Sequence, residues 1–285
     1  VRGTMLILWN VYNFFITYAN IDKWEASEES KASENILDKW IQSLLNQLVK
    51  DVTEALDQYD TVKAIDSLQS FVTDFSTWYI RRSRDRVGPS AEDGVDKRAF
   101  YATTYEVLIK LNKLLAPISP FFAESIYRNL TNEESVHLAD WPEYNNQLID
   151  EELNSSMDGV RAIVEKVHAI RKKNNLKVRQ PLRRIGFFGF PYLEKHYKYK
   201  FEDLLKDELN IKEVEYLKYR DIPEGQYIVD GTDEGKRKGR FFIDIEMTPA
   251  LKAEGEARDL VRTIQEERKK LGTAMDEKVN VTLPE

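Results

Sequence analysis

The chain has 285 residues, no cysteine and a net charge of −7 at pH 7. The lack of cysteine excludes disulfides, thiol nucleophiles and thiolate-bound zinc or iron–sulfur sites. With 42% hydrophobic and 32% charged residues, the composition is that of a globular chain long enough for two domains.

The N-terminal hydrophobic run, residues 5–21, predicts a buried helix and no membrane partner. Asn10, Asn13 and Asn20 interrupt the run, and it is too short for a comfortable membrane span. It also lacks the small-residue cleavage site of a signal peptide.

Apolar residues recurring three and four positions apart predict helices through the first half of the chain. Ser33 is the expected N-cap of the second helix. The remaining helices are expected after the turn at 59–60, at about 96–115, at 120–130 and at about 149–174. Residues 135–142 are expected to be extended and to pack through Val136, Leu138 and Trp141. Together these elements predict an antiparallel helical bundle over residues 1–174.

Beyond residue 174 the pattern changes to alternation and short apolar runs. Strands are expected at 177–182, 184–190, 211–219 and 279–283, a hairpin from 227–230 and 240–246, and helices at 193–209 and 249–271. The sequence therefore predicts a mainly α chain, in which the bundle is followed by a small α+β domain at 175–285.

An arginine cluster closes the third helix, where residues 81–86 carry a local charge of +3 within a chain of net charge −7. The cluster comprises Arg81, Arg82, Arg84 and Arg86, and it follows Trp78. Guanidinium groups and aromatic rings beside one another suit phosphates and unstacked bases. Equally, the arginines can complement the negative end of the helix dipole and pair with nearby carboxylates. Both interpretations stay open from this segment alone.

A second basic tract, residues 161–184, holds nine Lys or Arg and one Glu, a net charge of +8. Arg171 and Lys172 are expected on a helix, and Lys177, Arg179 and Gln180 on a strand where alternate side chains share a face. The turn containing Lys236, Arg237 and Lys238 is a third basic spot. A solvated lysine face is the competing explanation, but this segregation within an acidic chain favours contact with a polyanion.

Catalytic chemistry finds no support in the sequence. His137, His168 and His196 show no metal-ligand spacing and stand beside no nucleophile motif. We therefore expect no catalytic residue, no metal and no cofactor.

Several motifs resemble, in order along nearly the whole chain, the anticodon-binding region of the isoleucyl-tRNA synthetase family. They are residues 8–15 (Leu-Trp-Asn-Val-Tyr-Asn-Phe-Phe), 18–22, 78–86, 96–98, 115–121, 135–142, 177–182 and 254–262. The resemblance implies binding to the anticodon stem-loop of isoleucine tRNA. The residues assigned to tRNA on this basis are Trp78, Arg81, Arg82, Arg84, Arg86, Lys97, Arg98, Arg171, Lys172, Lys177, Arg179, Gln180, Lys236, Arg237 and Lys238.

The family's catalytic HIGH and KMSKS motifs do not occur in this sequence. The resemblance therefore implies that the chain binds tRNA without activating isoleucine, which in the class I parent requires ATP and magnesium. Because it has no cysteine, the chain resembles the zinc-free branch of the family, which is shared by archaeal, eukaryotic and some bacterial enzymes. A cytoplasmic monomer is expected. The alternatives are a helical protein-interaction module with solvated basic tracts, or the same region of a valyl-type synthetase.

Overall fold

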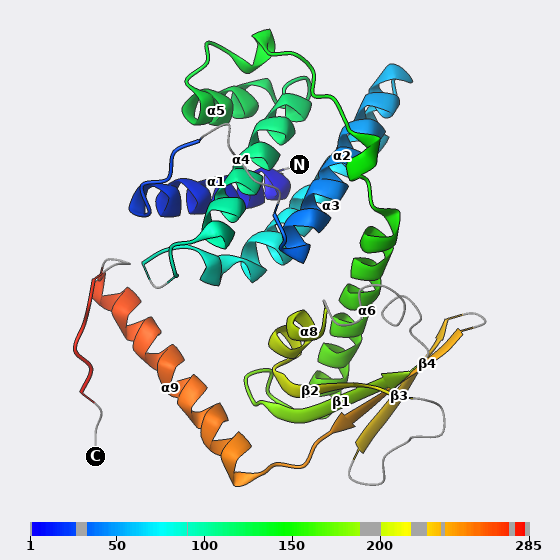
Figure 1. The fold of residues 1–285 in the computed structure, drawn as a ribbon, viewed down its shortest axis with the longest axis vertical. Coiled ribbons are helices and arrows are strands. Elements are labelled where there is room, and N and C mark those ends of the chain that lie inside the picture. The colour runs from blue at the N-terminus through cyan, green and yellow to red at the C-terminus, as the bar shows by residue number, and fades with distance from the viewer. Residues whose placement is uncertain are drawn as a thin grey trace. The chain divides into compact units, whose positions relative to one another are not determined.

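The computed structural model describes residues 2–26, 33–89, 91–188, 201–217, 227–234, 237–273 and 277–282 (Figure 1). For residues 2, 188, 227–234 and 237–240 only the backbone is considered. The chain divides into two compact units, Val1–Asn154 and Ser155–Glu285. The predicted mainly α fold with a small α+β part is confirmed.

The first unit is a helical bundle, in which short connections join α2 to α3 and α4 to α5. Its helices are α1 (Arg2–Ile21), α2 (Ile36–Asp57), α3 (Thr61–Asp74), α4 (Val95–Leu115) and α5 (Pro120–Thr131). Shorter helical turns are η1 (Phe75–Ile80), η2 (Arg84–Arg86), η3 (Val136–Leu138) and η4 (Asn146–Leu148). The predicted spacing of apolar residues is what builds the core: Ile41, Leu45 and Val49 of α2 are fully buried.

The start of α2 corrects one prediction. The N-cap is Asn35, whose side chain accepts a hydrogen bond from the Leu37 amide at 3.0 Å. The prediction of Ser33 was wrong, because its hydroxyl donates instead to Asp38 Oδ2 at 2.5 Å.

The arginine segment follows an unusual stretch of helix. Helix α3 passes directly into η1, a π-helix in which the Arg81 amide donates to the carbonyl of Ser76. A 3₁₀ turn, η2, comes next. Wide and tight turns in succession are typical of strained or functional segments.

The second unit contains a four-stranded sheet and three helices among the described residues. These are α6 (Glu151–Lys173, which begins at the end of the first unit), β1 (Leu182–Phe188), α8 (Glu202–Leu209), β2 (Ile211–Tyr216), β3 (Tyr227–Glu234), β4 (Arg237–Asp244) and α9 (Pro249–Leu271). The sheet order is β2-β1-β4-β3. Strands β1 and β2 are parallel, whereas β4 runs antiparallel to both β1 and β3.

The units meet at residues 154 and 155, earlier than the expected boundary at 174, so that α6 belongs almost entirely to the second unit. The buried face of α6 includes Met157, Val160 and Val167. The β3–β4 hairpin and helix α9 are confirmed.

Three other expectations are wrong in part. Residues 177–181 form no strand, and β1 begins only at Leu182. Within 135–142, Val136 is buried as expected, but η3 replaces the extended backbone and Leu138 is exposed. Residues 277–282 contain no strand, whereas 283 lies outside the described residues. Of the helix expected at 193–209, residues 193–200 also lie outside them.

Among the described residues, no helix has the length and apolar character needed to cross a membrane.

Candidate nucleic-acid interface

A stack of aromatic rings fixes the buried side of the arginine segment. Phe71 stacks on Phe75, Phe75 on Tyr79, and Tyr79 on Phe100 of α4, with ring centroids 5.7–6.0 Å apart. Phe75, Tyr79 and Phe100 are fully buried. Because this stack continues from α3 through η1, it determines which side of the segment turns outward.

Two arginines on the outward side lie over aromatic rings. The Arg81 guanidinium carbon is 5.9 Å from the centre of the half-buried Trp78 ring, and Arg81 Nε donates to the Thr77 carbonyl at 2.8 Å. Arg84 lies 5.9 Å from the ring of Phe14 on α1. Both arginines are exposed. A cation held over a ring presents a flat surface on which a base can stack.

Arg82 and Arg86 are placed differently, although they belong to the same cluster. Arg82 is half-buried. Arg86 turns into the unit, where its guanidinium lies 5.4 Å from the ring of Phe100. The four arginines are neighbours in sequence, but in the structure Arg81 and Arg84 are exposed while Arg86 points into the unit.

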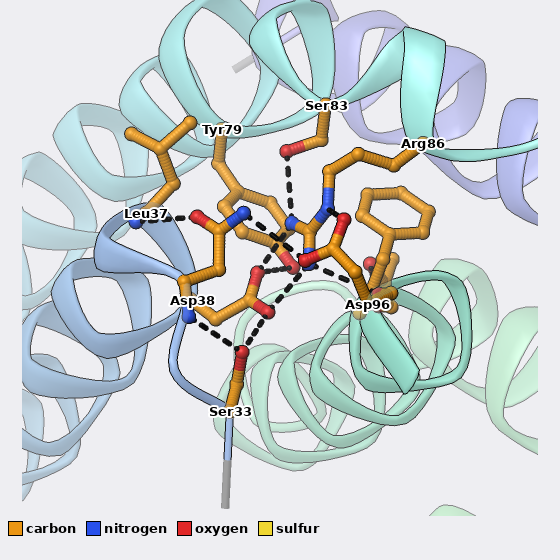
Figure 2. Close-up of polar contacts among 10 residues, drawn as sticks. Ser33, Leu37, Asp38, Tyr79, Ser83, Arg86 and Asp96 are labelled. Carbon is orange, nitrogen blue, oxygen red and sulfur yellow. Dashed lines mark hydrogen bonds and ion pairs between the residues drawn. The ribbon is translucent and has the colours of Figure 1, made fainter. Parts of the chain in front are cut away.

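Arg86 is the centre of a dense polar cluster (Figure 2). Its Nη1 and Nη2 donate to the two carboxylate oxygens of Asp38, each at 2.7 Å. Its Nε donates to Asp96 Oδ2 at 2.7 Å, and Nη2 reaches Asp96 Oδ1 at 2.8 Å. Arg86 Nη1 also lies 3.4 Å from the Ser83 hydroxyl. These contacts commit the donor groups of Arg86 to the interior.

Asp38 is fully buried and receives two further hydrogen bonds. The Tyr79 hydroxyl donates to Oδ1 at 2.8 Å, and the Ser33 hydroxyl donates to Oδ2 at 2.5 Å. Burial and the neighbouring Asp38 carboxylate raise the pKa of Tyr79 well above its ordinary value. Burial lowers the pKa of Arg86, but hydrogen bonds to Asp38 and Asp96 outweigh it, so the pKa is raised overall. Arg86 therefore stays charged and Tyr79 neutral at pH 7.

Lys97, the next residue on α4, belongs to a second buried cluster. Lys97 Nζ donates to Asp22 Oδ1 at 3.1 Å and to the Gly88 carbonyl at 3.2 Å. The Gly88 amide and the Tyr101 hydroxyl both donate to Asp22 Oδ2, at 2.9 and 2.5 Å. By contrast, Arg98 is exposed and lies 3.7 Å from Asp93.

In the second unit Arg171 is fully buried. Its Nη1 donates to the carbonyls of Lys177 and Gln180, each at 3.0 Å. Its Nη2 donates to those of Leu209 and Asn210, at 2.7 and 3.3 Å. Burial lowers the pKa of Arg171 to about 10, so the side chain remains charged at pH 7.

The neighbouring basic residues lie around the turn that Arg171 holds. Lys172 and Lys177 are exposed and form no ion pair with any described residue. Arg179 is exposed and lies 3.4 Å from Asp259 of α9. The Gln180 side-chain amide donates a hydrogen bond to the Leu251 carbonyl at 2.8 Å, so this side chain is directed into the unit and not toward solvent.

The third basic spot is only partly covered by the structure. Arg237 and Lys238 lie in strand β4, whereas Lys236 lies outside the described residues.

Sequence reasoning missed the acidic partners Asp22, Asp38 and Asp96, and also the ring partner Phe14. One signal was present, because Asp38 occupies the same helical face as Ile41 and Leu45. A carboxylate on an apolar face predicts a buried partner. No comparable pattern marks Asp22 or Phe14.

Comparison with known protein families gives a match over the middle of the chain. Residues 38–185, just over half of the chain, match the family described as the anticodon-binding domain of tRNA ligase. The matched residues include η1, η2 and the turn that Arg171 holds.

Several curated relatives are isoleucine–tRNA ligases. That of Dehalococcoides mccartyi strain CBDB1 is 40% identical over 94% of this chain and 27% of its own length. For Thermus thermophilus the identity is 33%, over 99% of this chain and 34% of the relative. For Clostridium acetobutylicum the identity is 42%, over 75% of this chain and 21% of the relative. The chain thus spans only about a fifth to a third of these relatives.

A solved LeuRS–tRNA–LeuAMS complex of Agrobacterium radiobacter K84 is 18% identical, covers 53% of this chain and 16% of that chain, and gives a TM-score of 0.35, too weak for a comparison of folds. The family match, in contrast, covers the helices that carry the arginine segment. On that basis, the chain belongs to the anticodon-binding domain family of tRNA ligases.

Proposed function

We propose that this chain binds the anticodon stem-loop of isoleucine tRNA, as part of a class I isoleucine–tRNA ligase of the zinc-free branch. The observation that carries the proposal is the pair of exposed guanidinium groups, Arg81 over Trp78 and Arg84 over Phe14, in a unit matched by the anticodon-binding family. The identity to isoleucine–tRNA ligases supports the choice of amino acid.

The bases of an anticodon loop are unstacked and offer both faces and edges, whereas the stem offers phosphates. Arg81 and Arg84 suit stacking and phosphate contact together. In the second unit, the exposed Lys172 and Lys177 suit the phosphate backbone. Arg86, Lys97, Arg171 and Gln180 act inside the protein in this proposal, because their side chains already donate hydrogen bonds to other groups of the chain.

Activation of isoleucine with ATP and magnesium would belong to other parts of a longer parent enzyme, since the chain spans only 27% and 21% of two of these relatives. We assign no cofactor to this chain. A cytoplasmic monomer fits the proposal.

The test is binding of this chain to transcripts of isoleucine tRNA, the same tRNA with a substituted anticodon, and valine tRNA. We expect the isoleucine transcript to bind most tightly. Arg84→Ala should weaken its binding about tenfold, the effect of roughly one charge-assisted contact, and leave the melting temperature unchanged.

The matched control is Arg128→Ala, which removes an exposed arginine from α5 of the same unit and should leave binding unchanged. Equal affinity for all three transcripts would contradict anticodon recognition. Preference for valine tRNA would favour the valyl-type alternative, and no binding at all would favour a protein-interaction module.

A further inference from the structure

Two carboxylates, those of the buried Asp38 and the half-buried Asp22, hold the end of the arginine segment from different elements. Asp38, in the first turn of α2, holds Arg86. Asp22, just after α1, holds the amide of Gly88. Gly88 has a φ of +88°, and a Cβ there would approach the Tyr18 ring to 2.8 Å. The chain from 86 to 88 is therefore fixed by side-chain contacts at both ends.

The first turn of α4 joins the two clusters through consecutive residues. Asp96 contacts Arg86, and Lys97 contacts Asp22. Neighbouring residues on a helix point in directions about 100° apart, so one helical turn can serve two clusters. Helices α1, α2 and α4 thereby converge on the segment that carries Arg84.

We infer that Arg86, together with Asp38 and Asp96, is a positioning group that fixes the turn from Ser83 to Arg86 and so places the Arg84 guanidinium on the tRNA-binding surface. This inference rests on the proposed function. It reassigns Arg86 from contact with RNA to the orientation of a neighbour.

The shape of the guanidinium makes this role specific to arginine. Arg86 binds two carboxylates with a planar fork, using Nε and both terminal nitrogens. A lysine ammonium keeps the charge but presents a single point, so it cannot hold both carboxylates in this plane.

The backbone of the turn also contributes hydrogen bonds. The Ser83 amide donates to the carbonyls of Tyr79 and Ile80 at 3.0 and 3.2 Å, which anchors the start of the turn. Further along, the Arg86 amide donates to the Ser83 carbonyl at 3.1 Å and the Val87 amide to the Arg84 carbonyl at 3.4 Å, so the Arg86 side chain is the main tie between the end of the turn and other helices. Arg84 itself is exposed and touches the Phe14 ring. Rotation of the turn would carry Arg84 away from that ring.

A double-mutant cycle on tRNA binding separates positioning from simple stabilisation. The variants of this chain are Arg84→Ala, Arg86→Lys and the two combined, measured with the isoleucine transcript below the melting transition of every variant. If Arg86 positions Arg84, the loss from Arg84→Ala should fall from about tenfold to about twofold in the Arg86→Lys background. Equal losses in both backgrounds would overturn the inference.

Asp96→Asn provides a second, milder variant, because the Asp96 side chain is 58% exposed and Asn35 also lies beside it. It should likewise reduce the effect of Arg84→Ala, and an undiminished tenfold effect would count against positioning. The control is Ile126→Ala, at a fully buried site on α5. It should lower the melting temperature while the tenfold effect of Arg84→Ala persists.

Binding by the wild-type chain distinguishes failure of the proposed function from failure of the inference about Arg86. Absence of tRNA binding by the folded wild type would overturn the proposed function and this inference with it. Normal binding with fully additive variants would overturn the inference alone.

Discussion

Asp22 shows how one side chain can organise the edge of the arginine segment. Burial raises the pKa of its carboxyl, but the hydrogen bonds from Tyr101, Gly88 and Lys97 outweigh burial and lower the pKa below its ordinary value of 3.8. The ionised form is therefore favoured by folding. A group of this kind stabilises the fold above its unfolded pKa, and the contribution is lost as the pH falls toward the folded pKa.

The expected result is an acid-dependent loss of stability that depends on Asp22. Below about pH 4 the free energy of unfolding should fall more steeply with decreasing pH in the wild type than in Asp22→Asn. Urea unfolding monitored by tryptophan fluorescence at several pH values, from neutral down to about 2.5, measures the difference. Parallel curves for the two proteins would show that Asp22 is not part of the acid response.

Residue type and spacing alone could not separate Arg84 from Arg86. Both are arginines of one 3₁₀ turn, and the difference between them lies in partners far away in sequence. Asp38 is 48 residues from Arg86. A local charge pattern therefore identifies a basic segment correctly without showing which of its members reach solvent.

At the scale of elements, Arg171 joins the ends of two helices. It lies in the last turn of α6, and its Nη2 binds the carbonyls of Leu209 and Asn210 at the end of α8. Helix C-termini leave carbonyls unpaired and carry partial negative charge, so a buried cation is favourable there even without a carboxylate. Within the described part of the chain Arg171 forms no ion pair.

Arg171→Met should lower the free energy of unfolding by roughly 2–4 kcal/mol, because four carbonyls lose their donor and two of those hydrogen bonds are buried. The turn it holds should also loosen, so trypsin should cleave after Lys177 and Arg179 faster than in the wild type. Arg171→Lys, which keeps the charge but reaches fewer carbonyls, should fall between the two. Unchanged stability and cleavage in the methionine variant would contradict this role.

The same contact explains the wrong strand at 177–182. The alternation of Lys177 and Arg179 is typical of a half-exposed strand. In the structure the carbonyls of Lys177 and Gln180 turn toward Arg171 rather than toward a neighbouring strand, and Pro181 lacks an amide proton for pairing. A tertiary contact thus outweighs a local pattern that the sequence displays plainly.

At the scale of the whole molecule, an acidic chain carries localised positive charge. The total is −7, yet residues 161–184 have a net charge of +8. Contacts with phosphates release counterions, so the logarithm of the binding constant falls linearly with the logarithm of the salt concentration. The slope reports the total number of phosphate contacts, and its change on substitution gives the share of one group of basic residues.

Lys172→Ala combined with Lys177→Ala should reduce the slope for isoleucine tRNA by about one to two, since each phosphate contact contributes roughly 0.7–0.9. Binding titrations over a series of salt concentrations give this value. Lys252→Ala, which removes an exposed lysine from α9 beside Glu256, serves as the control. An unchanged slope in the double variant would place the tRNA elsewhere.

The fold class and most helices could be predicted because apolar residues at helical spacing depend on neighbours within the same element. Ile41, Leu45 and Val49 are buried as that spacing requires. The division at 154 could not be predicted, because α6 presents the same spacing whichever unit its buried face contacts. The internal roles of Arg86, Lys97 and Arg171 likewise depend on distant acceptors.

The π-helix η1 has a consequence for insertions and deletions. The hydrogen bond from Arg81 to Ser76 spans five residues, one more than in an α-helix. The wide turn therefore takes up one residue more than an α-turn between the same two points. Removing one residue from 75–80 would restore an α-turn and leave the segment from Arg81 onward facing the same direction relative to α3. Adding a residue in the α-helical conformation would instead rotate that segment by about 100° about the axis. This turn should therefore tolerate the loss of one residue better than the gain of one.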